Sequence, residues 1–266
     1  MPLPFEHIKA DGDLRILLLC DHASNYIPPE YDGLGLPKYS LDEHIAYDLG
    51  AADLTRLLAE RLNCPAILSH FSRLLIDPNR GIDDPTLVVK LSDGNIIPAN
   101  REVDKYQDKT EWQKRIDHFY QPYNAAIHAH LDEAIGAGFS PIILSVHSFT
   151  PIWRGEDRPW HGAILWDRDP RLKDHMLDYF DKQASINFGD NTPYSGRLLG
   201  DCLYRHATRR GLAHGLIEIR QDISTNRVGR AEWTEHLYHV MQAALADPKT
   251  QRQNYYGSMS DINGRP

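Results

Sequence analysis

Two histidines of the sequence stand where a buried strand gives way to polar chain. His22 follows the aliphatic residues 16–19, and His147 follows a second aliphatic run at residues 142–144. Short apolar runs of this kind are typical of strands buried on both faces of a parallel sheet. Such sheets bind ligands at the carboxyl ends of their strands. Because imidazole is a common metal ligand, the pair predicts a shared metal site, although either histidine alone is compatible with a hydrogen-bonded loop residue.

A catalytic zinc ion usually takes a third protein ligand and keeps one position open for water. The next predicted helix offers Glu43, His44 and Asp48. His44 and Asp48 are four residues apart and would share one face of that helix. Their spacing alone leaves all three as candidates, with solvent-exposed helix residues as the alternative.

An acidic residue interrupts a further apolar strand. Glu218 lies between two isoleucines in the sequence LIEIR at 216–220. A lone carboxylate in a central strand is costly unless it is paired or used. Burial raises its pKa toward the range of a general base, and a nearby metal lowers it again. We therefore predict that Glu218 is the general base; the alternative is an edge strand on which Glu218 and Arg220 face solvent.

Two arginines flank the sequence LLIDPN at 74–79. The guanidinium groups of Arg73 and Arg80 are suited to bidentate binding of a carboxylate, so an acidic substrate would account for both. The alternative for Arg73 is a structural ion pair with Asp77, which would leave Arg80 unexplained.

Strands and helices that alternate along the chain must position these residues. Ser40 and Glu43 have the spacing of a capping box, which predicts a helix from Ser40 to about residue 62. This alternation predicts a single α/β domain over residues 1–266, with a mostly parallel or mixed central sheet flanked by helices. Residues 81–109 are irregular and form a predicted lid, and residues 247–266 a polar tail. Further strands are expected at 66–69, 74–76, 142–147, 163–166 and 216–220, and further helices at 111–135, 170–186 and 195–211. A polar loop then leads into a last helix, whose apolar face includes Trp233, Leu237, Val240, Met241 and Leu245.

The composition excludes several classes of protein. The formal net charge of -8 argues against a protein that mainly binds nucleic acid. No apolar run has the roughly 18 residues of a membrane helix, and the first residues lack the features of a signal peptide, so we expect a cytoplasmic protein. The three cysteines do not suggest a disulfide framework. The G-x-S-x-G, H-E-x-x-H, G-x-G-x-x-G and Walker motifs are absent from the sequence.

Six segments, in this order along the chain, resemble the N-formylglutamate amidohydrolase family. The most specific are SRLLIDPNR and IEIRQD. The resemblance implies a hydrolase that releases formate from an N-formylated acidic amino acid, with a role in amino-acid catabolism such as histidine breakdown. The segments are CDHASNYIP (20–28), HIAYDLGA (44–51), SRLLIDPNR (72–80), SVHSFTP (145–151), NTPYSG (191–196) and IEIRQD (217–222).

The resemblance also implies a fold similar to that of the zinc carboxypeptidases. In that group the metal ligands come from an early and a mid-chain strand end, which match His22 and His147, and a late glutamate, which matches Glu218, is the general base. Asn25 stands where the carboxypeptidase pattern has an acidic ligand, so we take Asp48 as the third ligand. The family tends to have proline before the first histidine and glycine two residues after it. Here those positions are Asp21 and Ser24, which suggests a divergent branch.

Together these features predict a metal-dependent amidohydrolase, most simply a zinc enzyme, for a small acidic N-acyl amino acid such as N-formyl-L-glutamate. Its predicted ligands are His22, Asp48 and His147, and its predicted base is Glu218. One alternative is a deacylase or metallopeptidase of similar mechanism that acts on another N-acyl amino acid. The other is a non-catalytic binder of acidic small molecules. The predicted substrate contacts are Arg73, Arg80, Arg220, Asn191 and Tyr194.

Overall fold

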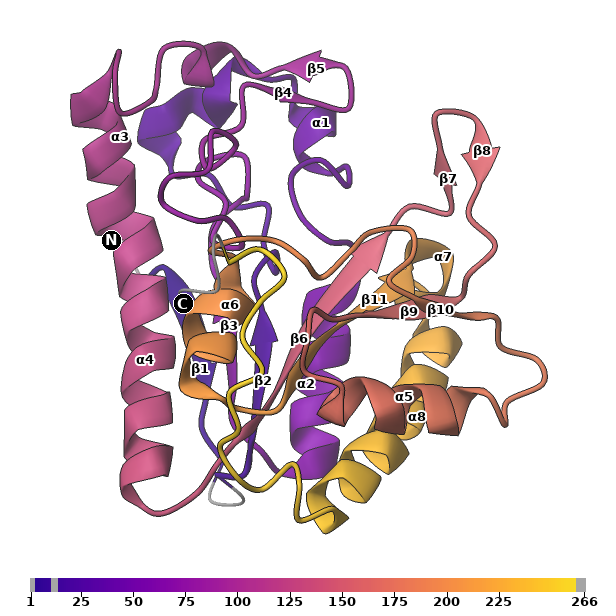
Figure 1. Cartoon of the computed structure of the whole chain (residues 1–266). Helices are drawn as coiled ribbons and strands as arrows, with labels where there is room; N and C mark the ends of the chain where they lie inside the picture. Colours follow the sequence, from indigo (N-terminus) through magenta and orange to yellow (C-terminus); the bar gives the residue numbers. More distant parts are fainter. Residues whose placement is uncertain (1–2, 11–13, 262–266) are drawn as a thin grey trace.

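A seven-stranded mixed sheet forms the centre of the molecule (Figure 1). The computed structural model describes residues 3–10 and 14–261. The sheet contains β1 (Phe5–Ile8), β2 (Ile16–Cys20), β3 (Ala66–Ser69), β6 (Ile142–Phe149), β9 (Gly162–Leu165), β10 (Phe188–Asp190) and β11 (His214–Arg220). Its order is β1-β3-β2-β6-β11-β9-β10. The four strands from β3 to β11 in this order are parallel, whereas β1 and β9 run antiparallel to their neighbours β3 and β11.

Helices cover both faces of the sheet (Figure 1). The helices are α1 (Lys38–Leu41), α2 (Ala51–Leu62), α3 (Lys109–Arg115), α4 (Gln121–Gly136), α5 (Arg171–Phe180), α6 (Cys202–His206), α7 (Gln221–Ser224) and α8 (Arg227–Ala246). A π-helical turn, Ile116–Tyr120, joins α3 to α4, so that one long helix results. Short 3-10 segments occupy Pro29–Gly35, Pro98–Asn100 and Thr208–Arg210. Two hairpins form separate two-stranded sheets: β4 (Leu91–Ser92) with β5 (Asn95–Ile96), and β7 (Ile152–Trp153) with β8 (Glu156–Asp157).

The central strands are mainly apolar, and both of their faces are buried. Leu17 and Leu19 of β2 belong to the core that includes α4 and α6. Ile16 and Leu18 belong to the opposite core, which includes α2, α5 and α8. Successive side chains of a strand point to opposite faces, so His147 of β6 lies on the α4 side. The predicted α/β architecture with a mixed central sheet is confirmed.

The helix predicted to begin at Ser40 is wrong in its first half. Ser40 lies inside α1, whose N-cap is Pro37, and the long helix α2 begins only at Ala51. Gly50 precedes α2 with φ +78, a left-handed conformation that glycine adopts without a steric penalty. Asp48 therefore lies in a turn, where its N–H donates to the carbonyl oxygen of His22 at 2.9 Å, rather than on a helix face.

Two other predicted elements differ from the structure. Residues 74–76 form a buried turn instead of a strand, because side chains replace strand partners there: Asn100 donates to the carbonyl oxygen of Leu74 and Arg115 to that of Leu75. The helices predicted over 170–186 and 195–211 shorten to α5 and α6. β1 and β10 were not predicted, since each is a short strand at the margin of the sheet.

The predicted lid and tail have defined positions. The hairpin β4–β5 lies within the 81–109 segment, above the carboxyl ends of the parallel strands (Figure 1). Of the predicted tail, residues 247–261 are described and pack on the domain, where Asn254 N donates to the carbonyl oxygen of Gly211 at 2.7 Å. The rest, 262–266, lies outside the described residues.

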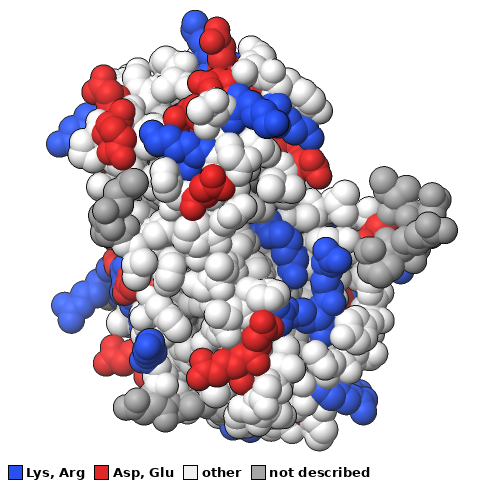
Figure 2. All heavy atoms as spheres, turned by 90° about the vertical axis from the view of Figure 1, so that its left-hand side faces the viewer, with Lys and Arg blue, Asp and Glu red and all other residues white. Residues whose placement is uncertain are grey.

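The helices and the surface charges were compared with those of membrane and nucleic-acid-binding proteins. Among the described residues, no helix has both the length and the apolar character needed to cross a membrane. On the face shown in Figure 2, basic and acidic side chains are interspersed rather than gathered by sign.

Candidate active site

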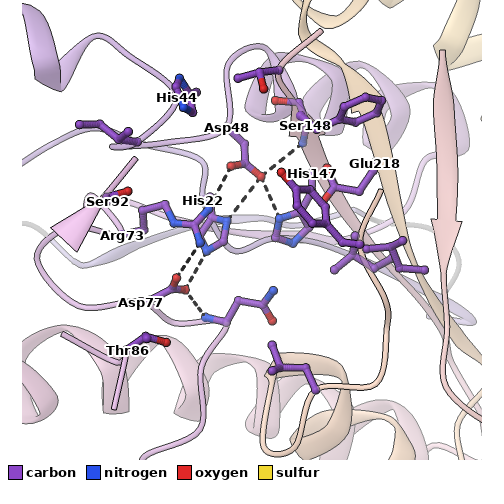
Figure 3. Close-up of a pocket in the computed structure, with 18 of the residues that line it drawn as sticks. His22, His44, Asp48, Arg73, Asp77, Thr86, Ser92, His147, Ser148 and Glu218 are labelled. Atoms are coloured by element: carbon purple, nitrogen blue, oxygen red, sulfur yellow. Dashed lines mark hydrogen bonds and ion pairs between the residues drawn. The ribbon is translucent and has the colours of Figure 1, made fainter. Parts of the chain in front are cut away.

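Three buried side chains from separate parts of the chain converge near the carboxyl end of the parallel strands (Figure 3). They are His22, directly after β2, Asp48, in the turn before α2, and His147, inside β6 rather than beyond its end. One ligand atom of each lies within 4.8 Å of the others. Asp48 Oδ2 is 2.8 Å from His147 Nδ1 and 3.4 Å from His22 Nδ1. Both imidazoles therefore direct Nδ1 to the same point.

The outer nitrogen of each histidine meets another carboxylate. His22 Nε2 is 2.7 Å from Asp77 Oδ1, and His147 Nε2 is 3.2 Å from Asp21 Oδ2. Metal-binding histidines commonly donate their second N–H in this way, which fixes the ring and leaves the inner nitrogen free to bind. The geometry has the form of a metal site with its outer hydrogen bonds in place.

The donor set fits a zinc-type divalent ion. His22 Nδ1 is buried and has no hydrogen-bond partner among residues 3–10 and 14–261, which is unusual for a buried polar atom. Two imidazole nitrogens and one carboxylate are ligands that zinc accepts, and three leave a position open. Burial opposes ionisation, but the two histidines hold the pKa of Asp48 well below its usual value. Burial would lower the pKa of His147, yet hydrogen bonds to Asp21 and Asp48 raise it to about 10, so the site favours a cation.

Glu218 lies beside the three ligands on the neighbouring strand. β11 is internal, between β6 and β9, and its residue Glu218 stands opposite His147 in the parallel register. Glu218 Oε2 is buried without a hydrogen-bond partner in the described part of the chain. Burial, with a contribution from the charge of Asp48, raises the pKa of Glu218 to about 7. A carboxyl group with this pKa is suited to accept and return a proton near neutral pH.

A cavity of about 560 Å³ opens above these residues. Its floor holds the three candidate ligands and Glu218 (Figure 3). The predicted lid contributes one wall, the β7–β8 hairpin a second, and the loop before α6 a third. The wall residues include Thr86, Ser92, Asp93, Trp153, Arg154, Tyr194 and Arg197.

Arg73 and Arg80 both line the cavity but differ in their contacts. Arg73 Nη2 is 2.9 Å from Asp77 Oδ2, and Nη1 is 3.5 Å from Asp48 Oδ1. Arg80 Nε is 3.9 Å from Asp77 Oδ2. The structural ion pair considered for Arg73 is therefore present, and Arg80 is the arginine with more freedom to meet a ligand.

Of the remaining predicted substrate contacts, one lines the cavity and two do not. Tyr194 lines the cavity, and its hydroxyl accepts a hydrogen bond from Arg158 at 3.0 Å. Arg220 does not line the cavity; its guanidinium group binds Asp222 at 2.8 Å. Asn191 also lies outside the lining, because its Oδ1 accepts backbone N–H groups of residues 166 and 196 and so shapes the loop.

The other residues considered as the third ligand have other partners. His44 Nε2 lies 3.2 Å from Asp93 Oδ2, at the lid wall. Asn25 Nδ2 donates to the carbonyl oxygen of Leu41, and Glu43 is exposed. Asp48 is thus the candidate that the fold brings to both histidines.

Two carboxylates that contact the candidate ligands were missed from the sequence. Asp77 was considered only as a partner of Arg73, and Asp21 only as a departure from the family pattern, although each meets a candidate ligand. The signal for Asp21 was its acidic side chain at a buried position between a core strand and His22. For Asp77 no local signal existed, because 55 residues separate it from His22.

Comparisons with known proteins show the family and the fold of the chain. The model of the N-formylglutamate amidohydrolase family matches residues 14–224. The chain belongs to the N-formylglutamate amidohydrolase family. It is accordingly a hydrolase that acts on an amide bond. No protein with a curated description matches the chain.

Solved structures show the same fold over most of the chain. A gene product of Agrobacterium tumefaciens is 33% identical, with a TM-score of 0.85; the match covers 92% of this chain and 95% of that one. The N-formylglutamate amidohydrolase of Ralstonia eutropha JMP134 is 21% identical, with a TM-score of 0.62, over 91% and 97% of the two chains. The resemblance predicted from the six segments is confirmed.

Proposed function

We propose that this family member is a zinc-dependent enzyme that hydrolyses the N-formyl amide of an acidic amino acid, with N-formyl-L-glutamate as the reference substrate. The observation that carries the proposal is the convergence of His22 Nδ1, Asp48 Oδ2 and His147 Nδ1 beside a buried carboxyl group, Glu218. The products are formate and the free amino acid.

The chain supplies the proton transfers. Zinc, held by His22, Asp48 and His147, would polarise the amide carbonyl and lower the pKa of water. Glu218 accepts a proton from the attacking water while the oxygen of that water forms a bond to the formyl carbon. The same carboxyl group then delivers that proton to the amide nitrogen as the C–N bond breaks, so the amine leaves protonated.

Residues on the cationic side of the cavity would orient the substrate. Arg80, whose guanidinium is 3.9 Å from its nearest carboxylate, would bind a substrate carboxylate. Arg73 holds Asp48 and Asp77 in position and adds positive charge to the same wall. Tyr194 offers a hydroxyl from the opposite loop. Such contacts mainly orient the amide for attack.

A second candidate within the same class is a deacylase for a larger N-acyl amino acid. The cavity of about 560 Å³ lies within the range of drug-sized ligands, so it has room beyond a formyl group. N-acetyl and longer N-acyl derivatives of glutamate belong in the substrate panel for this reason.

The decisive experiment measures formate release from N-formyl-L-glutamate together with zinc content. We expect one bound zinc ion and turnover in the wild type. Glu218→Gln should keep the zinc and lose about 10²- to 10⁴-fold in kcat, the usual contribution of a general acid–base. Glu232→Gln makes the same change on the exposed surface of α8 and is the control.

Each contrary result removes a defined part of the proposal. Full activity in Glu218→Gln would exclude Glu218 as the base. A wild type that takes up no divalent ion when zinc is supplied would exclude the metal mechanism. Turnover of a longer N-acyl substrate, without formate release, would move the assignment to the second candidate. Binding of these compounds without hydrolysis of any would indicate a binder.

A further inference from the structure

Asp21 is a fully buried carboxylate that the proposed reaction leaves without a role. It follows the last residue of β2 and has 0% exposure. An ionised group in such a place is costly unless its charge is compensated. In the described ranges of the chain, no lysine or arginine forms an ion pair with it, and its one ion-pair partner is His147.

The hydrogen bonds of Asp21 come from three sides. Tyr123 of α4 donates its hydroxyl to Oδ1 at 2.9 Å. Ser145 of β6 donates its hydroxyl to Oδ2 at 2.8 Å, and His147 Nε2 lies 3.2 Å from the same oxygen. The carboxylate is therefore held rigidly between the helix and the sheet.

This network keeps a hydrogen on Nε2 of His147. The Ser145 hydroxyl gives its proton to Asp21, so toward His147 Nε2, at 3.0 Å, it presents only a lone pair. Both neighbours of Nε2 are thus acceptors, and Nε2 must carry the hydrogen. Nδ1 then faces Asp48 and His22 as the nitrogen that a metal would use.

We infer that Asp21 is a positioning residue for the metal site: it fixes His147 with its hydrogen on Nε2 and raises the affinity of Nδ1 for a cation. The inference rests on the proposed zinc site. Carboxylate partners of this kind typically contribute 10- to 100-fold to metal affinity.

The test compares zinc affinity, measured by chelator competition, in the wild type and Asp21→Asn. An asparagine keeps the shape but can present an N–H to Nε2, so we expect about 10- to 100-fold weaker binding. Asp167→Asn is the matched control, because Asp167 is also buried and accepts a backbone N–H, that of Met259, outside the cavity. Its zinc affinity should equal that of the wild type.

A second readout does not depend on zinc. In protein labelled with 15N-histidine, the Nε2–H proton of His147 should be downfield and protected from exchange in the wild type, and should shift upfield or exchange in Asp21→Asn. Tyr123→Phe serves if Asp21→Asn does not fold. It removes only the hydroxyl that orients Asp21, and we expect a smaller, several-fold loss of zinc affinity.

The outcomes separate this inference from the proposed function. Unchanged zinc affinity together with an unchanged Nε2–H signal, or an equal loss in Asp167→Asn, would overturn the role of Asp21. A wild type that binds zinc but releases no formate would refute the substrate and leave the role of Asp21 intact. If the wild type binds no zinc, the metal site fails, and the Nε2–H signal alone decides whether Asp21 orients His147.

Discussion

Asp201, at the cavity wall, should make the stability of the protein fall as the pH rises. The residue is 6% exposed and is the N-cap of α6, where its side chain accepts the N–H of Tyr204 at 2.6 Å. Burial raises the pKa of Asp201 from 3.8 to about 7, although the Tyr204 N–H and the charge of Arg205 oppose the rise. In the folded state the group therefore keeps its proton to a higher pH than in the unfolded chain.

The magnitude follows from linkage. Between about pH 4 and pH 7 the folded state binds more protons at Asp201 than the unfolded state does, so stability is lost over this window. A difference of about 3 pKa units corresponds to about 4 kcal/mol. Asp201→Asn stays neutral and can still accept the Tyr204 N–H. Relative to the wild type, the variant should gain up to about 4 kcal/mol of unfolding free energy from pH 4 to pH 8.

The assay is urea denaturation of the zinc-free proteins at pH 4.5, 6 and 8, with the wild type and variant compared at each pH. Asp108→Asn makes the same substitution at the exposed N-cap of α3 and controls for the loss of a capping carboxylate. A difference between Asp201→Asn and wild type that stays constant across the three pH values would refute the reasoning.

Two further predictions concern the arginines and the turn that carries Asp48. Arg80→Met should raise KM for N-formyl-L-glutamate by about 10- to 100-fold with little change in kcat. Arg73→Met should also lower the melting temperature, because it leaves the buried Asp77 without its partner at 2.9 Å. Equal losses of stability in the two variants would contradict this difference between the arginines. Gly50→Ala should lower the unfolding free energy by about 2–4 kcal/mol in denaturant titrations, because a Cβ there would lie 2.2 Å from the carbonyl oxygen of residue 224. Gly94→Ala, at a similar positive φ with open space around it, isolates the backbone strain, and an equal loss there would exclude the clash.

The central sheet could be predicted from the sequence because its strands are buried on both faces. The aliphatic runs at the starts of β2 and β6 and the apolar flanks of Glu218 in β11 have no other good explanation in a chain of this composition. The same logic failed at residues 74–76. Those apolar side chains are buried, but burial alone does not require a strand. A side chain such as that of Arg115 can donate the hydrogen bond to the backbone carbonyl that a neighbouring strand would otherwise supply.

The sequence predicted those site residues that are polar within an apolar stretch, but not the contacts that they make in the fold. His22, His147 and Glu218 each stand out against an apolar background, and the structure brings them together with Asp48. The capping-box spacing at Ser40 suggested one continuous helix, whereas residues 42–50 are not helical and α2 begins only after the left-handed Gly50. Arg220 follows directly on the last buried residues of β11, and only the structure shows its guanidinium turned toward Asp222.

The pairing of β6 with β11 has a consequence for how this enzyme could diversify. Glu218 and His147 are direct neighbours across two parallel strands, so the distance between the proposed base and the candidate ligand is determined by backbone hydrogen bonds at the strand spacing of about 4.8 Å. The walls that would recognise a substrate belong to the 81–109 segment, the β7–β8 hairpin and the loop before α6. Exchange of those walls would alter which amide is accepted without moving the reacting groups, so new substrate preferences can arise while the chemistry is conserved.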